Sequence, residues 1–250
     1  MPRDTADHQR PQDASRRDER AHRILDAAGE LVLRLGYDKT TVDDVARQAG
    51  VAKGTIYLHW NTREVLFAAL LRRDRAAMVT EVRRGVAADP DDITLRGLVR
   101  QLGLALMRRP LMKAVFLGDA TVLGKFLREK PNSETTGALL TSFESYLETL
   151  RRHGAIRSDL SPPEQMNVFG GAVYGFFLIS PLMPNDYRLP DERLADLLAD
   201  TVHRALEPGR EVSPDEAQAI SAATLEHLDF AVEVAHEKAR QSLDAKEHTP

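Results

Sequence analysis

Residues 39–60, KTTVDDVARQAGVAKGTIYLHW, constrain the fold more strongly than any other part of this chain. Thr41 stands three residues before Asp44, which is the spacing of a capping box at the start of a helix. The apolar residues that follow fall on one helical face: Val42, Val45, Ala46 and Ala49. Gly50 offers the left-handed conformation in which helices often end. Residues 52–57 form a second helix that is too short to be stable unless it packs on its neighbour, and the pattern therefore predicts a helix-turn-helix.

The second of these helices presents small or basic groups, which can enter the major groove of DNA. Lys53 can donate to O6 or N7 of a guanine, or to a phosphate. Gly54 lets the backbone approach DNA closely, and Thr55 offers a hydroxyl and a methyl group. The alternative interpretation is an ordinary helical hairpin, which composition alone would favour.

The sequence TTVDDVARQAGVAKGTIYLHW, followed by NTREVL at 61–66, resembles the DNA-binding signature of the tetracycline-repressor (TetR) family of bacterial regulators. The resemblance extends from about Arg20 to Leu71 and favours DNA binding over the hairpin interpretation. Two positions depart from the family pattern. Ala52 replaces a frequent serine, so one hydroxyl contact to phosphate is absent. Arg63 replaces the usual lysine and keeps its charge.

The side chains around the predicted reading helix can donate to phosphates that flank the groove. The predicted DNA-binding residues are Thr41, Lys53, Gly54, Thr55, Tyr57, His59 and Arg63. Tyr57 can serve either in packing or in DNA contact, whereas Trp60 is expected to pack.

Composition and charge limit the class of protein to which this chain can belong. The chain has 250 residues, 42% of them hydrophobic, and no cysteine, which excludes disulfides and Cys-ligated zinc and fits a reducing cytoplasm. Residues 1–20 lack the apolar stretch of a signal peptide. Residues 1–85 hold 16 Lys and Arg against 13 Asp and Glu, and residues 86–250 hold 18 against 25, so the small basic excess coincides with the helix-turn-helix.

Apolar periodicity and breaker residues predict an all-α chain. The family resemblance implies an N-terminal three-helix DNA-binding domain and a C-terminal helical domain for ligand binding and dimerisation. We expect a disordered arm at 1–14, the helix-turn-helix domain at 15–71, the second domain at 72–207, and an additional helix and tail at 208–250. The expected helices cover residues 15–35, 42–49, 52–57, 62–86, 92–109, 111–129, 133–154, 163–180, 191–206 and 214–240. Ser15 with Asp18 and Asn61 with Glu64 have the spacing of helix caps.

Residues 166–183, MNVFGGAVYGFFLISPLM, carry no charge. A membrane span is one interpretation, but the stretch is short for a bilayer and contains Asn167 and Pro181. The preferred interpretation is a helix buried on most of its surface. The resemblance implies that the helices at 163–180 and 191–206 form a dimer interface, and the residues predicted for it are Gly171, Gly175, Leu194 and Leu198.

The family resemblance also implies an effector pocket in the second domain. The residues chosen for its lining are Met78, Met107, Phe116, Phe143, Tyr146, Phe169 and Phe177, which otherwise belong to the core. The eight histidines show no metal-ligand spacing, and no cofactor fingerprint occurs, so we expect neither metal nor cofactor.

These observations predict a DNA-binding transcriptional regulator, and the resemblance implies a homodimeric repressor that a small hydrophobic effector releases from a palindromic double-stranded DNA operator. One rival is a ligand-independent architectural or protein-interaction factor that uses the same helix-turn-helix. A second rival is an enzyme with an appended DNA-binding module, which the lack of a catalytic constellation disfavours. We therefore expect a cytoplasmic protein without enzymatic activity.

Overall fold

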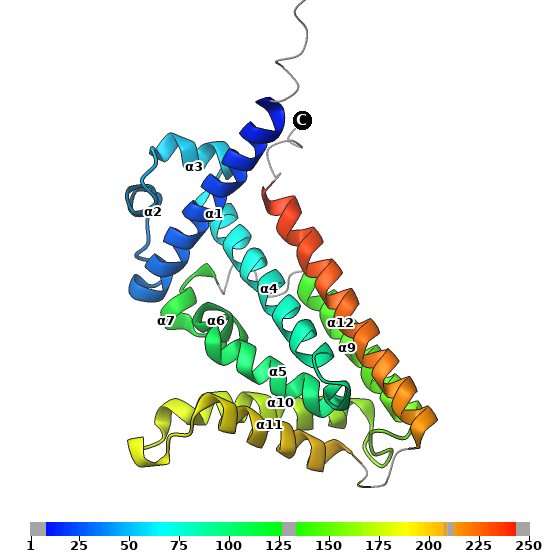
Figure 1. Cartoon of the computed structure of the whole chain (residues 1–250). Helices are drawn as coiled ribbons and strands as arrows, with labels where there is room; N and C mark the ends of the chain where they lie inside the picture. Colours follow the sequence, from blue (N-terminus) through cyan, green and yellow to red (C-terminus); the bar gives the residue numbers. More distant parts are fainter. Residues whose placement is uncertain (1–8, 127–133, 208, 210–212, 244–250) are drawn as a thin grey trace, which may run out of the picture. The chain divides into compact units, whose positions relative to one another are not determined.

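The computed structural model of the chain describes residues 9–126, 134–207, 209 and 213–243 (Figure 1). This described part contains helices and connecting turns and no strand, which confirms the all-α prediction. The α-helices are α1 (Gln9–Leu35), α2 (Val42–Ala49), α3 (Lys53–His59), α4 (Arg63–Ala87), α5 (Leu95–Arg108), α6 (Pro110–Leu117), α7 (Ala120–Leu123), α9 (Glu134–Arg152), α10 (Pro162–Ile179), α11 (Asp191–Leu206) and α12 (Pro214–Leu243). Short 3-10 turns occupy Pro90–Asp92, Ser180–Leu182 and Asn185–Tyr187.

The described residues form two compact units, and neither is a single stretch of sequence. The first unit contains residues 9–74, 118–126 and 236–243. The second unit contains the described residues of 75–117 and 134–235. Helices α4 and α12 each contribute residues to both units. The linear division expected from the sequence therefore leaves out two segments, 118–126 and 236–243, that fold with the N-terminal helices.

Several helix boundaries differ from those expected, for local reasons. Residues 9–14 are helical where a disordered arm was predicted, so Ser15 lies inside α1 and does not cap it; residues 1–8 lie outside the described part. At α4 the cap is Thr62, whose hydroxyl accepts the N–H of Val65 at 3.2 Å, and the prediction of Asn61 was wrong. The single helix expected at 111–129 is interrupted at Gly118, which has a φ of 63°.

The first unit is built on the apolar stripe of α1, which buries Ile24, Leu25, Ala28, Leu31 and Val32 as predicted. Leu35, expected in the same stripe, is 41% exposed. Tyr37 follows α1 and is buried, with its ring 5.0 Å from Phe67 and 5.3 Å from Phe126. Its main-chain N–H donates to the carbonyl of Val122 at 2.8 Å. The segment 118–126 is therefore fixed to the end of α1.

The second unit is centred on α5, which packs along α11. Arg96 pairs with Asp200 at 2.8 Å, and Arg100 pairs with Asp196 at 2.6 Å. Helix α10 packs against α11, α9 and α6. Burial in α10 is limited to Gln165, Val173 and Phe177, so the expectation of a helix buried on most of its surface was wrong. The other faces of α10 expose apolar groups, with Leu178 53% and Ile179 46% exposed.

None of the described helices is both long enough and apolar enough to cross a membrane.

Candidate nucleic-acid interface and ligand cavity

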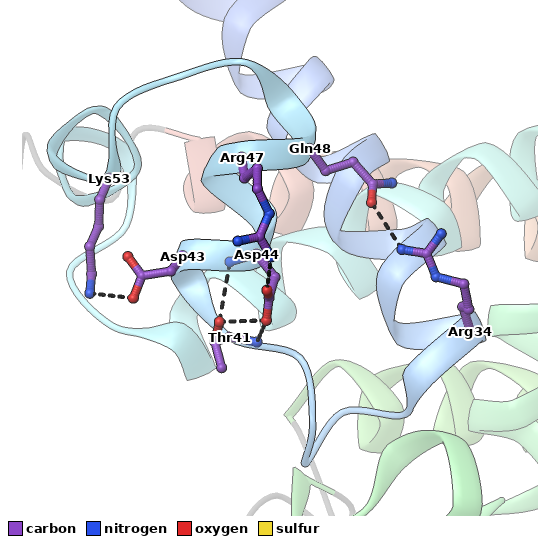
Figure 2. Close-up of polar contacts among 7 residues, drawn as sticks. All are labelled: Arg34, Thr41, Asp43, Asp44, Arg47, Gln48 and Lys53. Atoms are coloured by element: carbon purple, nitrogen blue, oxygen red, sulfur yellow. Dashed lines mark hydrogen bonds and ion pairs between the residues drawn. The ribbon is translucent and has the colours of Figure 1, made fainter.

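The helix-turn-helix is held by the local signals that the sequence predicted. The Thr41 hydroxyl donates to the Asp44 carboxylate at 2.6 Å and accepts the Asp44 N–H at 3.2 Å, so the capping box is confirmed (Figure 2). The hydrogen bonds that the Asp44 carboxylate accepts from the hydroxyl and from the main-chain N–H of Thr41 lower the pKa of Asp44 below its ordinary value. Gly50 ends α2 with a φ of 64°, in the left-handed conformation expected for it. Helix α2 is thereby fixed at both ends, and it supports α3 through its buried apolar face.

Helix α3 divides its side chains between the core and the solvent. Ile56 and His59 are buried against the rest of the first unit. Lys53 and Gly54 are exposed in the first turn, and Tyr57 is 38% exposed one turn later. A Cβ atom on Gly54 would meet no heavy atom within 4 Å, so the backbone here is open to a partner. The exposed face therefore combines a cation, an uncovered backbone and an aromatic hydroxyl, as the groove-entry prediction requires.

Lys53 has a partner inside the protein. Lys53 Nζ lies 2.8 Å from a carboxylate oxygen of Asp43, which projects from the first turn of α2 (Figure 2). This hydrogen bond and the charge of Asp43 raise the pKa of Lys53 above its ordinary value, so the ammonium is charged at neutral pH. Both side chains remain well exposed. Any phosphate or base that Lys53 contacts must compete with Asp43.

Two of the predicted DNA-contacting residues have packing roles in this structure. His59 is 4% exposed, and its ring lies 5.2 Å from that of Trp60. His59 is therefore part of the core in the DNA-free chain, and its expected donation to a phosphate stays a prediction. The Arg63 guanidinium lies 3.9 Å above the ring of Tyr37, a cation–π contact that fixes the start of α4. DNA contacts by Thr41, Lys53, Gly54, Thr55, Tyr57 and Arg63 stay predictions.

The second unit contains a cavity of about 400 Å³, open to solvent, that is lined by α4, α5, α6, α9, α10 and α12. Three of the seven residues predicted for an effector pocket line it: Phe116, Phe143 and Phe169. The sequence analysis missed most of the wall, which includes Val79, Val82, Leu98, Leu102, Val173 and Leu228. The lining is apolar apart from Arg75, His227 and the hydroxyl of Tyr174, which donates to the carbonyl of Phe116. A cavity of this size and composition suits a small, mainly apolar molecule.

The remaining four residues chosen for the pocket lie elsewhere. Phe177 is buried, with its ring 6.0 Å from that of Phe116. Tyr146 belongs to a separate hollow of about 560 Å³ between α9 and α12. Met78 and Met107 are half-buried and do not line the cavity. These four positions were wrong as lining residues of this cavity, because their side chains lie on other faces of their helices.

One imidazole lies in the walls of both hollows. His227 of α12 shares a hydrogen bond of 2.8 Å between its Nδ1 and the hydroxyl of Ser142 on α9, and its ring stacks at 5.1 Å on that of Tyr146. Burial lowers the pKa of His227 to about 4, so the ring is neutral at physiological pH. Tyr146 is itself buried, which raises its pKa, and its hydroxyl is 3.0 Å from that of Thr224. The cavity is therefore bordered by uncharged polar groups on this side.

A surface groove of about 440 Å³ follows the other face of α10. Gly171, Gly175 and Leu194, three of the four residues predicted for dimerisation, line it together. Leu198 does not, because it is fully buried and its side chain lies 3.4 Å from where a Cβ atom on Gly103 of α5 would stand. The assignment of Leu198 to an interface was wrong, since that residue belongs to the core of the second unit.

No group of three or more His, Asp or Glu side chains that could hold a metal ion occurs among the residues described.

Comparison with known proteins identifies the family. The family model described as bacterial regulatory proteins, tetR family, matches residues 24–70. The uncharacterized HTH-type transcriptional regulator Rv2250c of Mycobacterium tuberculosis is 30% identical over 143 residues, which cover 54% of this chain and 69% of that protein. This chain belongs to the TetR family.

Other relatives of this TetR-family chain differ in the direction of regulation given by their names. The transcriptional repressor AcnR of Corynebacterium glutamicum is 28% identical over 113 residues, covering 42% of this chain and 60% of its own. The transcriptional activator FasR of Mycolicibacterium smegmatis is 34% identical over 76 residues, covering 30% and 35%. The chain thus matches less than two thirds of the length of either relative.

Solved structures agree in fold. A TetR-family regulator from Marinobacter aquaeolei has a TM-score of 0.55 at 18% identity, covering 78% of this chain and 98% of its own. A Rhodococcus protein described as a TetR-family regulator has a TM-score of 0.57 at 21% identity, covering 76% and 100%. The chain is accordingly a TetR-family DNA-binding transcriptional regulator with an N-terminal helix-turn-helix and a helical C-terminal part.

Proposed function

We propose that this regulator is a homodimeric repressor that leaves a palindromic operator when a small, mainly apolar molecule binds in the second unit. The observation that carries the proposal is the cavity of about 400 Å³, one wall of which is α4. Val79 and Val82 of α4 line the cavity, and the same helix begins at Arg63, four residues after α3 ends. A ligand that favours one position of α4 can therefore bias the position of α3, provided that its affinity differs between the two states.

A second copy of the chain is the proposed occupant of the α10–α11 groove. The surface around it is apolar, with Leu182 75%, Tyr187 71% and Leu189 46% exposed. Patches of this kind on a soluble protein usually mark an interaction surface. Two-fold symmetry would also double the number of base pairs that the short helix α3 reads on a palindromic site.

Release from the operator by a ligand is tested with a variant whose added side chain fills the cavity. Gly170 lines the cavity, and a Cβ atom there would meet no heavy atom within 4 Å, so Gly170→Leu places its Cβ atom without a clash and adds side-chain volume at the cavity wall. Gly137→Leu on α9 is the matched control, because Gly137 is exposed and equally open. A panel of apolar compounds is screened by calorimetry with and without an operator duplex selected from a random-sequence library. We expect a binding compound to weaken operator affinity about 5- to 150-fold, with the operator weakening compound affinity by the same factor.

The same screen also tests the alternative of a ligand-independent architectural factor. Gly170→Leu should lose the compound and keep the operator, while Gly137→Leu should keep both. Compounds that bind equally well with and without operator would reject ligand relief and favour a ligand-independent architectural factor.

Dimerisation is tested at Gly175. A Cβ atom on Gly175 also meets nothing within 4 Å in the single chain, so Gly175→Leu should not disturb the fold of the protomer. At a close helix contact with a second copy, the added side chain would overpack the interface. Light scattering should therefore show monomers for Gly175→Leu and dimers for Gly137→Leu. A Gly175→Leu protein that remains dimeric would place the interface elsewhere.

A further inference from the structure

The buried residues of helix α12 share one helical face. The buried positions of the helix are Ile220, Thr224, Leu228, Ala231, Ala235 and Ser242. At 100° per residue these six positions lie within about 80° of arc. The first five belong to the second unit and Ser242 belongs to the first. Ser242, in the last turn of the helix, therefore lies on the same helical face as the five buried residues of the second unit.

Ser242 meets two residues of the helix-turn-helix unit. The indole Nε1–H of Trp60 donates to the main-chain carbonyl of Ser242 at 3.0 Å. The guanidinium of Arg72 donates to the Ser242 hydroxyl at 2.6 Å, and that hydroxyl donates to the carbonyl of Lys238 at 2.8 Å. Trp60 is 1% exposed and Ser242 is 2% exposed, so the hydrogen bond between them lies in a site that is shielded from water, whereas Arg72 is half-buried.

These contacts satisfy groups that would otherwise lack partners. The carbonyls in the last turn of a helix have no intrahelical N–H, and Ser242 is one residue from the end of α12. A buried indole N–H is in turn costly to leave without an acceptor. The positive guanidinium of Arg72 also stands at the negative end of the α12 dipole, which is the favourable arrangement. This junction, formed by Ser242 with Trp60 and Arg72, is thus complementary in hydrogen bonding and in charge.

Trp60 is the residue that ends the reading helix. Its main-chain N–H donates to the carbonyl of Ile56 at 2.9 Å and closes α3, and its side chain is the one held by Ser242. We propose that the last turn of α12 positions α3 for DNA reading, with Ser242 acting through Trp60 and Arg72. The DNA-reading unit then includes a C-terminal element that lies 182 residues from Trp60 in sequence.

The test compares two shortened chains in the absence of any ligand, so its outcome does not depend on ligand relief. A chain ending after Ala239 lacks Ser242, whereas the control chain ending after Leu243 keeps α12 whole. Operator affinity is measured by anisotropy on a duplex selected by the full chain. We expect the chain ending at Ala239 to bind about 5- to 100-fold more weakly and the control to match the full chain.

Tryptophan fluorescence reports the junction directly, because Trp60 is the single tryptophan of the chain. Emission should shift to the red in the chain ending at Ala239 and stay unchanged in the control. Positioning through Trp60 also predicts that Trp60→Phe and the shortening to Ala239 are not additive in operator affinity. Full operator affinity in the chain ending at Ala239, or additive effects, would overturn the proposal.

If that chain does not fold, as judged by circular dichroism, Ser242→Leu in the full-length chain replaces it. A leucine at this buried site displaces Trp60 while α12 keeps its length. We expect the same red shift and loss of operator affinity, and unchanged affinity for Ser242→Leu would overturn the proposal equally.

Discussion

Replacement of Lys53 by alanine separates base reading from phosphate binding. In the DNA-free protein the Lys53 ammonium is 2.8 Å from Asp43, but the side chains are 49% and 62% exposed. Water and salt screen an ion pair of this exposure, so its loss should leave the melting temperature nearly unchanged. An effect of Lys53→Ala on DNA affinity therefore reports the DNA contact itself and not the stability of α3.

The expected size depends on what Lys53 contacts. If it donates to a guanine, Lys53→Ala should weaken binding of the selected operator about 5- to 150-fold and relax the base preference at one position in each half-site. If it contacts only a phosphate, binding should weaken similarly on every sequence, and the slope of log affinity against log salt should fall by about 1. Anisotropy titrations of operator and scrambled duplexes over a range of salt distinguish these cases.

A substitution of Asp43, the ion-pair partner of Lys53, tests whether Asp43 competes with DNA for that lysine. Asp43→Asn removes the carboxylate that competes for Lys53, so affinity for scrambled DNA should rise. Asp26→Asn is the control, because Asp26 pairs with Arg73 at 2.7 Å in the same unit and its loss removes the same charge. Operator affinity that is unchanged in Lys53→Ala at constant salt would refute groove entry by this residue, and equal effects of Asp43→Asn and Asp26→Asn would refute the competition.

Two further predictions concern the second unit. Leu198→Ala should lower the free energy of unfolding by about 2–5 kcal/mol in a denaturant titration, because it empties a buried site against α5. The control Leu182→Ala, at a residue 75% exposed, should have little effect. Equal stability of the two variants would argue against the assignment of Leu198 to the core. Burial lowers the pKa of His227 from 6.5 to about 4, so between these pH values the unfolded chain binds a proton that the folded chain does not. The free energy of unfolding should therefore be highest above pH 6.5 and fall toward pH 4 by up to about 3 kcal/mol. Thermal melts of His227→Gln should show a smaller decline than the parent between pH 7 and 4.5, and parallel curves would contradict the prediction.

The parts of the fold that could be predicted from sequence are those fixed by nearby residues. The capping box joins Thr41 to Asp44, and the left-handed end of α2 requires only Gly50. Helix α11 begins and ends where its pattern predicted, between Pro190 and Glu207. Each of these signals acts within about one helical turn of the residue that carries it, so sequence spacing is sufficient to find it.

The features that sequence analysis missed depend on which face of a helix meets a distant segment. Phe169 and Phe177 are aromatic residues of one uncharged helix, yet the first lines the cavity and the second lies in the core. Apolar periodicity does not decide between them, because α10 carries apolar side chains on several faces. The contact of Trp60 with Ser242 joins positions 182 residues apart and leaves no local signal in either segment.

Helix α10 shows how the uncharged stretch that first suggested a membrane span can carry two functions. Gly170 opens on the cavity, while Gly171 and Gly175 open on the groove, so the helix separates the proposed ligand from the proposed second copy. No side chain of the protomer fills the space beside any of these glycines, since a Cβ atom on each would meet nothing within 4 Å. A requirement of the single-chain core would have left atoms in van der Waals contact with those positions. The open glycines leave room for partners that approach α10 from outside the protomer core, and leucine at Gly170 or at Gly175 should remove one partner without the other.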